Sequence, residues 1–471
     1  MTPVTKLNWS AFTSTGLDLS AAKTALNGTS LGNLTALIDL RASGTVALDI
    51  LGYALAVGKF EFDQRSGING SDGAITLTNA SAQRLSLSDL QFFVGLGATF
   101  VEDANHKVTG ISTDDTLGFS VAGASLDLVI VKEGAGTRKW MGLAASVGAM
   151  EVHGLSSTFD LQVLDLALRF NGKAADASKL DWSALAGLSG DPLGILATDL
   201  SGIVRATDVS ITGSVWVNID NFVYLSGSIA LQRKEMFVKT VGATSTTKMS
   251  VLTLGASNLR VFAGVGDADS DDDRVVDNDT LLAQNAVGVL LAIDNLAIVL
   301  AKPVVALGAP VSSKSYFALS GSGSGSLIGV DGVELSGRVA VSINQGKEKL
   351  NNVTSNVAAI DFAASATANP EAFGDPSGLK AVTGPSADQF VIVDFSESNL
   401  LKVSGYVSIS IADFLHLSGQ FAFSQSGTPQ TVKIAGSTAT KQVNVMTIGA
   451  SDVNAFVGVG GLFRRPRSTS C

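Results

Sequence analysis

Alternation of apolar and polar residues dominates this chain and predicts β-strands. Residues 45–51 (TVALDIL), 159–163 (FDLQV) and 405–411 (GYVSISI) all alternate in this way. Successive side chains of a strand point to opposite faces, so each run has one buried and one solvated face. Short turns such as Asn171-Gly172 and Asp331-Gly332 separate such runs. Strands joined by short turns pair antiparallel, so the pattern predicts an all-β fold of antiparallel meanders.

Helical periodicity is confined to two stretches. Residues 9–27 and 182–198 are candidates for a short helix or loop, each near the start of a repeated segment. The most apolar window, residues 286–308, is interrupted by Asp294 and Lys302. We therefore expect two buried strands in this window and no membrane-spanning segment.

One apolar, glycine-rich signature recurs along the chain. It reads LTLGASNLRVFAGVG at residues 252–266, MTIGASDVNAFVGVG at 446–460 and, in a more divergent form, LSLSDLQFFVGLG at 85–97. A second motif, Lys-Leu-Asn/Asp-Trp-Ser-Ala, occurs at residues 6–11 and 179–184. Such recurrence is typical of repeat proteins. The spacing is about 170–190 residues, which is the length of a whole domain.

The recurrence divides the chain into tandem modules. We expect a first repeat unit at residues 6–178, a second at 179–370 and a truncated third at 371–461. Residues 462–471 are basic and lack a strand pattern, so we interpret them as an unrelated tail. The expected architecture is an elongated array of antiparallel β-rich modules. A parallel β-helix or solenoid is the alternative, although its rungs would repeat every few tens of residues, and no such period occurs within a unit.

Composition fits this architecture and narrows the classes of partner. Only 16% of the residues are charged and 50 are glycine, which favours short strands and tight turns over long exposed helices. The 42 acidic residues outnumber the 32 basic ones, which argues against nucleic acid as a partner, because a phosphate-binding surface needs a basic stripe. The single cysteine, Cys471, leaves no disulfide framework and favours a bacterial extracellular protein.

An aspartate-rich stretch after the second signature is the sharpest candidate for a ligand site. Asp269, Asp271 and Asp273 fall at alternate positions, and Asp277 and Asp279 follow. Ca²⁺ takes about six to eight oxygen ligands, and carboxylates at the first, third and fifth positions of a turn converge on one such ion. We therefore expect these five aspartates to hold Ca²⁺ and to stiffen the loop.

Two departures from such calcium-binding loops leave a solvated acidic loop as the alternative. Arg274 stands where the sharp turn requires glycine, and Thr280 stands where a bidentate carboxylate normally lies. In the first unit the corresponding residues are 102–107, with Asp114 and Asp115 further on. This stretch has fewer carboxylates and an added lysine, so it is a weaker candidate.

Motifs for catalysis are scarce. His106, His153 and His416 occupy unrelated places in the units and lack the spacing of a transition-metal site. Residues 321–325 (GSGSG) have glycine at the centre, where a hydrolase elbow has serine, and are interpreted as a flexible strand or linker. We expect the protein not to be an enzyme, because an active site seldom needs several diverging copies of its scaffold.

The combined motifs resemble the long tandem repeats of giant bacterial surface proteins, including those with an LEPR-XLL-type N-terminal signal. Residues 222–227 with 255–266, and 414–419 with 449–460, carry the resemblance, which extends over nearly the whole chain. In the first unit Tyr53 replaces the leading phenylalanine of the motif. The resemblance implies a secreted or surface-displayed, adhesin-like role with Ca²⁺-stabilised modules.

The expected function is therefore that of a structural or adhesive segment of a large extracellular or cell-surface bacterial protein, with an unknown surface or matrix ligand. Two functions of other classes stay open. A carbohydrate-active enzyme domain would be favoured by a cleft that gathers carboxylates from separate strands. A lipid-handling groove on a long β-sheet would be favoured by a continuous apolar trough lined by Val, Leu and Phe.

Overall fold

The computed structural model describes Lys6 and residues 35–459, apart from 53, 115, 154–158, 306–311, 413, 426–429, 437 and 444. The short helix or loop expected at residues 9–27 and the tail at 462–471 lie outside the described residues. The structure is 65% strand and 6% helix, which confirms the all-β prediction. It divides into two compact units, residues 1–154 with 165–211 and residues 155–164 with 212–471.

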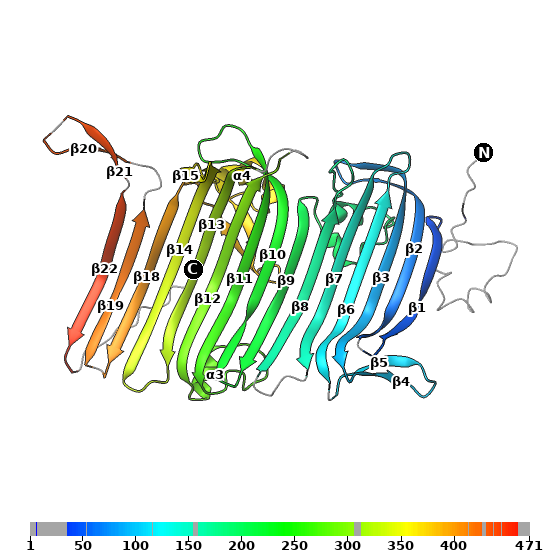
Figure 1. The fold of residues 1–471 in the computed structure, drawn as a ribbon, viewed down its shortest axis with the longest axis horizontal. Coiled ribbons are helices and arrows are strands. Elements are labelled where there is room, and N and C mark those ends of the chain that lie inside the picture. Colours follow the sequence, from blue (N-terminus) through cyan, green and yellow to red (C-terminus); the bar gives the residue numbers. More distant parts are fainter. Residues whose placement is uncertain are drawn as a thin grey trace. The chain divides into compact units, whose positions relative to one another are not determined.

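The first unit is an antiparallel meander. Its strands follow the order β1 (Ile38–Ile50), β2 (Ala54–Ser71), β3 (Thr76–Leu96), β6 (Leu117–Lys132), β7 (Lys139–His153) and β8 (Phe159–Gly172), of which β8 has residues in both units (Figure 1). The hairpin of β4 (Thr99–Glu102) and β5 (Val108–Ser112) lies between β3 and β6 in the sequence.

Residues 173–206 cover one face of the first sheet and complete its core. Trp182, at the start of α2 (Trp182–Ala186), is buried with Trp140 of β7. Asp181 caps α2 by accepting the Ala184 N–H at 3.0 Å. Residues 182–198, expected to be a short helix or loop, contain both: the five-residue α2 and, because glycines and a proline follow, a loop. A 3₁₀ turn, η3 (Asp199–Gly202), comes after this loop.

The second unit is a longer antiparallel meander with segments packed on one face. The strand order is β9 (Thr207–Ile219, shared between the units), β10 (Val223–Val238), β11 (Thr247–Val265), β12 (Val287–Pro303), β13 (Lys314–Ile328), β14 (Val333–Leu350), β18 (Leu400–Ile411), β19 (Leu415–Gln425) and β22 (Met446–Val457). β15 (Val353–Val357) also pairs with β14, and two hairpins are formed by β16 (Leu379–Val382) with β17 (Phe390–Val393) and β20 (Gln430–Lys433) with β21 (Thr440–Val443).

The described residues of the second unit form three short helices: α3 (Asn278–Ala283), α4 (Phe362–Ala368) and α5 (Pro370–Phe373). The β16–β17 hairpin lies directly on the sheet, since a Cβ on Gly255 of β11 would be 2.1 Å from the Val382 carbonyl oxygen. The repeat boundaries predicted from the sequence stay a prediction. α4 ends just before the predicted start of the third unit at residue 371. Among the described residues, no helix has the length and apolarity to cross a membrane.

The same bulge interrupts the signature strand at three places. One strand residue there has a left-handed φ near 51° and lies opposite a glycine of the preceding strand; the pairs are Asp89 with Gly58, Asn258 with Gly227, and Asp452 with Gly419. At Gly227 the glycine is required, because a Cβ there would lie 2.6 Å from the Leu259 Cα. A parallel β-helix is wrong, since every described strand pair whose register is defined is antiparallel.

The structure tests four local predictions. The apolar window at 286–308 contains one long strand, β12, with an extra residue at Asp294, rather than two strands. Residues 321–325, expected to be a flexible strand or a linker, are a strand, since they are paired on both sides within β13. Asn171-Gly172 ends β8 instead of forming a hairpin turn, whereas Asp331-Gly332 is a turn as predicted.

Candidate functional site

The loop after β11 brings three of the five predicted metal ligands together. One carboxylate oxygen from each of Asp269, Asp271 and Asp273 lies within 4.8 Å of the other two. Asp269 is half-buried, and the other two are exposed. Their oxygens are the hard ligands that Ca²⁺ prefers, and the group contains no nitrogen or sulfur donor of the kind that zinc favours.

The backbone of this loop explains the convergence. Arg274 has a φ of 60° and therefore takes the left-handed turn for which glycine was expected. Its N–H donates to Asp269 Oδ1 at 2.6 Å, and the Asp269 N–H donates to Asp267 Oδ1 at 3.0 Å. The arginine thus substitutes for glycine at a backbone cost of about 1–2 kcal/mol.

Two buried side chains anchor the loop to the core of the second unit. Ala268 and Val276, on either side of the three aspartates, are fully buried with Tyr224 and Phe262. The Val276 N–H also donates to Ser226 Oγ of β10 at 2.8 Å. The position of the carboxylates is therefore fixed at both ends of the loop.

The other two predicted ligands serve the next helix. Asp277 caps α3 by accepting the Thr280 N–H at 2.7 Å, and Asp279 lies in the first turn of that helix. A carboxylate at either position is favourable near a helix N-terminus. The candidate metal centre is therefore the group of Asp269, Asp271 and Asp273, which we call the aspartate triad.

Asp269 is a weaker acid than an ordinary aspartate. Its burial, together with the charges of Asp273, Asp271 and Asp272, raises the pKa of this carboxyl above its usual value. A divalent cation between the carboxylates would remove this penalty, because it favours the ionised form.

The weaker candidate in the first unit has a different structure. Asp103 lies in the β4–β5 hairpin and accepts the N–H groups of Asn105 at 2.8 Å and Lys107 at 3.0 Å. These hydrogen bonds lower the pKa of Asp103. Its neighbour Glu102 contacts His106 at 3.2 Å. Local groups therefore already engage these carboxylates, while Asp115 lies outside the described residues.

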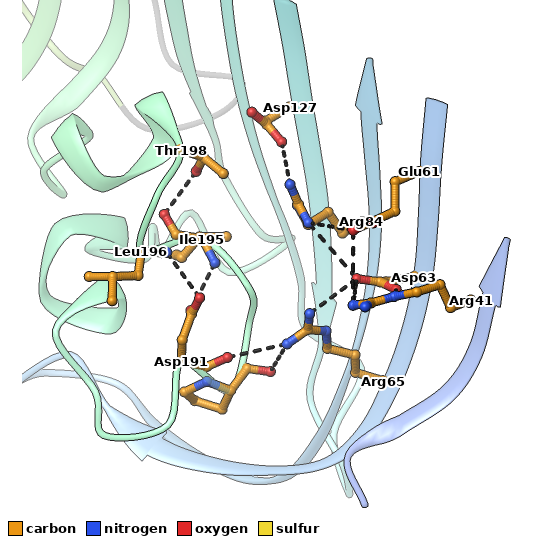
Figure 2. A network of polar contacts seen from close by, with 11 residues as sticks. Arg41, Glu61, Asp63, Arg65, Arg84, Asp127, Asp191, Ile195, Leu196 and Thr198 are labelled. Carbon is orange, nitrogen blue, oxygen red and sulfur yellow. Dashed lines mark hydrogen bonds and ion pairs between the residues drawn. The ribbon is translucent and has the colours of Figure 1, made fainter. Parts of the chain in front are cut away.

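A buried network of charges in the first unit has no counterpart in the sequence predictions. Asp63 of β2 is fully buried and accepts two hydrogen bonds from Arg41, at 2.5 and 2.9 Å, and one from Arg65 at 3.1 Å (Figure 2). Arg84 joins Glu61 at 3.2 Å to Asp127 at 3.0 Å. Three arginines thus balance three carboxylates on four neighbouring strands.

This network attaches the covering loop to the sheet. Arg65 donates to the carbonyl oxygens of Asp191 at 3.2 Å and Pro192 at 3.4 Å, and Asp191 accepts the Ile195 N–H at 2.8 Å (Figure 2). The loop passes so close that a Cβ on Gly194 would lie 2.4 Å from Arg65 Nη2. Because its charges are paired with one another, we interpret the network as structural.

An apolar groove of about 810 Å³ lies on the second sheet, across β11–β14 and β18–β19. Its walls are large apolar side chains: Leu259, Val261, Leu291, Leu296, Leu319, Leu335, Val339 and Phe421. Leu291 is 52% exposed and Phe421 41%. The groove is therefore an apolar surface open to solvent.

Alternating glycines make the floor of this groove. Gly321, Gly323 and Gly325 point to one face of β13, while the serines between them point to the other. This face is opposite to the one on which the β16–β17 hairpin lies. Gly255, which contacts that hairpin, pairs with Ala297 of β12. The adjacent residue Leu296 points to the other face and pairs with Gly321. The Gly-Ser run is thus a groove-forming strand.

A second hollow of about 620 Å³ is lined by Ser322, Arg338, Tyr406, Gln420 and other residues of β12–β22. Asp294 supplies the one carboxylate among its described lining residues, and it pairs with Arg260 at 3.3 Å. The paired carboxylates of a glycosidase are therefore not gathered in this hollow.

Comparison of the chain with protein-family models, curated proteins and solved structures finds no match.

Proposed function

We propose that this chain is a structural, non-enzymatic scaffold of tandem β units within a secreted or surface-displayed bacterial protein, with an adhesive role. The observation that carries the proposal is the threefold recurrence of the bulge formed by Asp89, Asn258 and Asp452 opposite glycine. The same β-bulge at corresponding positions of three signature strands supports a repeated module. The bacterial and cell-surface parts rest on the resemblance of the signature to giant surface proteins.

A second recurring device supports the repeated module. Asn171 near the end of β8 donates to the carbonyl oxygens of Leu180 at 2.9 Å and Val204 at 3.3 Å. Asn344 of β14 donates in the same way to Ile360 and Glu397, both at 2.8 Å. In each case the first acceptor directly precedes an aspartate that caps a short helix. Each buried asparagine thus holds a covering segment on its sheet.

Ca²⁺ is the proposed cofactor of this scaffold. The aspartate triad would supply three ligands, with backbone oxygens and water completing the coordination. Because the loop is anchored at Ala268 and Val276, a bound ion would stiffen a segment attached to the core of the second unit.

Calcium titration of the full chain tests this proposal. Calorimetry should detect Ca²⁺ binding, and the melting temperature should rise with Ca²⁺ because binding to the native state adds about 2.7 kcal/mol at a hundredfold excess over Kd. Asp271→Asn should abolish both effects. Asp272→Asn is the matched control: it removes the same charge from the same loop outside the triad, and asparagine tolerates its φ of 59°. Equal calcium responses in the two variants would contradict the proposed site.

The apolar groove favours a second function, the binding of one extended acyl chain. Its apolar side chains and glycine floor form the continuous trough expected of a lipid-handling sheet, and its volume lies within the usual range of about 300–1,000 Å³ for ligand sites. A fluorescent fatty acid should bind the protein and should be displaced by lipid extract. Gly325→Leu should fill the floor and weaken binding, whereas Ser324→Leu, on the opposite face, should not. Binding unaffected by Gly325→Leu would exclude this groove.

A further inference from the structure

In each of two pairs of neighbouring strands, a glycine of one strand lies directly opposite a glycine of the other, and their backbones are in close contact. Gly95 of β3 lies opposite Gly118 of β6, and Gly264 of β11 lies opposite Gly288 of β12. A Cβ on Gly95 would be 2.1 Å from the Leu117 carbonyl oxygen, and one on Gly264 would be 2.2 Å from that of Val287. No side chain fits at either position of the pair.

An aromatic ring covers each glycine pair. Phe93 and Phe262 stand two residues before Gly95 and Gly264, and both rings are fully buried. The rings lie 3.0 and 2.8 Å from the positions that a Cβ would take on Gly118 and Gly288. Aromatic cover of a cross-strand glycine replaces the packing that the missing side chain would give.

β22 and the residue after it, Gly458, contain half of this arrangement. Phe456 and Gly458 match Phe262 and Gly264 in the signature, and the Phe456 ring lies 3.1 Å from the Cβ position of Gly458. The side towards β19 is complete, because the Gly458 N–H donates to the Phe414 carbonyl at 2.9 Å, just as the Gly264 N–H donates to Phe222. Phe456, however, is 42% exposed.

No described strand lies along the other edge of β22. Within the part of the chain that the structure describes, β22 pairs only with β19, whereas β3 and β11 pair on both edges (Figure 1). Edge strands are usually blunted by lysine, proline or inward charges. β22 has no lysine or proline, and Asp452 is its single charged residue.

We propose that this edge of β22 binds an antiparallel strand of the β12 type, with a glycine opposite Gly458, an alternating apolar sequence and an extra residue opposite Asp452. The register follows from β11 and β12, where Gly288 lies opposite Gly264 and Asp294 aligns with Asn258. The Phe456 ring then covers the new glycine pair and becomes buried, as Phe262 is. The partner is thus a polypeptide strand that resembles β12 of this chain.

A labelled peptide of residues 287–303, with a solubilising lysine tail, tests this inference on the full-length protein. Fluorescence anisotropy should show saturable binding, and hydrogen exchange should slow at the β22 amides. A Gly288→Val peptide should bind about tenfold more weakly or worse, because its side chain would meet the Gly458 backbone. The protein variant Gly458→Ala should show the same loss. Gly449→Ala is the matched control in β22, since a Cβ there meets no atom within 4 Å.

Absence of binding by the parent peptide would overturn the inference. Equal binding of the Gly288→Val peptide, or equal binding by Gly458→Ala protein, would overturn it as well, since either result places the peptide elsewhere. The inference extends the repeated module of the proposed function and is independent of the aspartate triad. A protein that binds Ca²⁺ but not the peptide would therefore contradict the inference alone.

Discussion

The indole N–H of Trp182 donates to Asn171 Oδ1 at 2.9 Å, and both side chains are almost completely buried. Asn171 also donates to the Leu180 and Val204 carbonyl oxygens, so one amide joins β8 to three points of the covering segment. A buried polar group costs free energy when its partner is lost, which makes this amide a sensitive position.

Asn171→Ala should destabilise the first unit by about 3 kcal/mol, because it leaves an indole N–H and two carbonyl oxygens without their buried partner. Urea unfolding followed by tryptophan fluorescence measures the change. Asn105→Ala, at an exposed position of the β4–β5 hairpin, is the control and should change stability by less than about 0.5 kcal/mol. A similar midpoint for the two variants would show that the covering segment is held in another way.

Asp269→Asn should have opposite effects with and without calcium. The raised pKa of Asp269 means that its ionised form destabilises the native loop at neutral pH. In chelator the variant should therefore melt at or above the parent temperature, because asparagine keeps the Oδ1 acceptor for the Arg274 N–H. In Ca²⁺ it should lose the stabilisation that the parent gains. A lower melting temperature in chelator would argue against repulsion within the triad.

Acid should weaken the first unit through Asp63 and Asp72. Burial alone would raise the pKa of both carboxyls. Hydrogen bonds outweigh this effect and hold both pKa values below the usual range. Asp63 accepts them from Arg41 and Arg65, and Asp72 from backbone N–H groups and Arg205. For a lowered pKa, the stabilisation is complete above the unfolded value of about 3.9 and disappears as the pH falls through the folded value.

Urea midpoints measured between about pH 5 and pH 2 should therefore fall for the first unit. Asp72→Asn should flatten this part of the pH profile while lowering stability at neutral pH. An unchanged pH profile in Asp72→Asn would mean that other carboxyls carry the acid sensitivity.

Lys234→Met should stabilise the second unit. Burial, assisted by the charge of Lys380, lowers the pKa of Lys234, which shares a face of β10 with buried Met236 and Val238. Below its folded pKa the charged amine opposes folding, so methionine should raise stability by about 1 kcal/mol, measured from the melting temperature at neutral pH. Arg233→Met, on the opposite and exposed face, is the control. A destabilised Lys234→Met protein would show that the amine has a structural role.

The strands were predictable because one periodicity governs them, and the turn at Asp331-Gly332 was predictable from its residues alone. For residues 321–325 the sequence left a flexible strand and a linker open, because the composition indicates flexibility. The strands on both sides supply the hydrogen bonds that make it the strand β13. Asn171-Gly172 was taken for a turn because the same residue pair forms hairpins, and only the tertiary contacts of Asn171 identify its other use.

The site was predictable only in part for a related reason. Alternate spacing indicated the aspartate triad, but Asp277 caps a helix, and a capping aspartate cannot be told from a ligand by residue type. The network around Asp63 left one signal, the charges of Glu61, Asp63 and Arg65 at alternate positions of a single strand. Its partners on β1, β3 and β6 depend on strand register, which the sequence does not specify.

The bulge of the signature strand has a consequence for chain length. β11 contains one more residue than β10 requires, and β12 contains one more than β13 requires, but Asn258 and Asp294 align, so the ladder between β11 and β12 is continuous. The extra residue of β11 and the extra residue of β12 therefore leave the register between these two strands unchanged. Single-residue deletions elsewhere in these strands would exchange their faces, whereas joint removal of Asn258 and Asp294 would leave Phe262 facing the core. Length is thus matched within the β11–β12 pair, so an insertion or a deletion in one of these two strands is tolerated when the other changes with it.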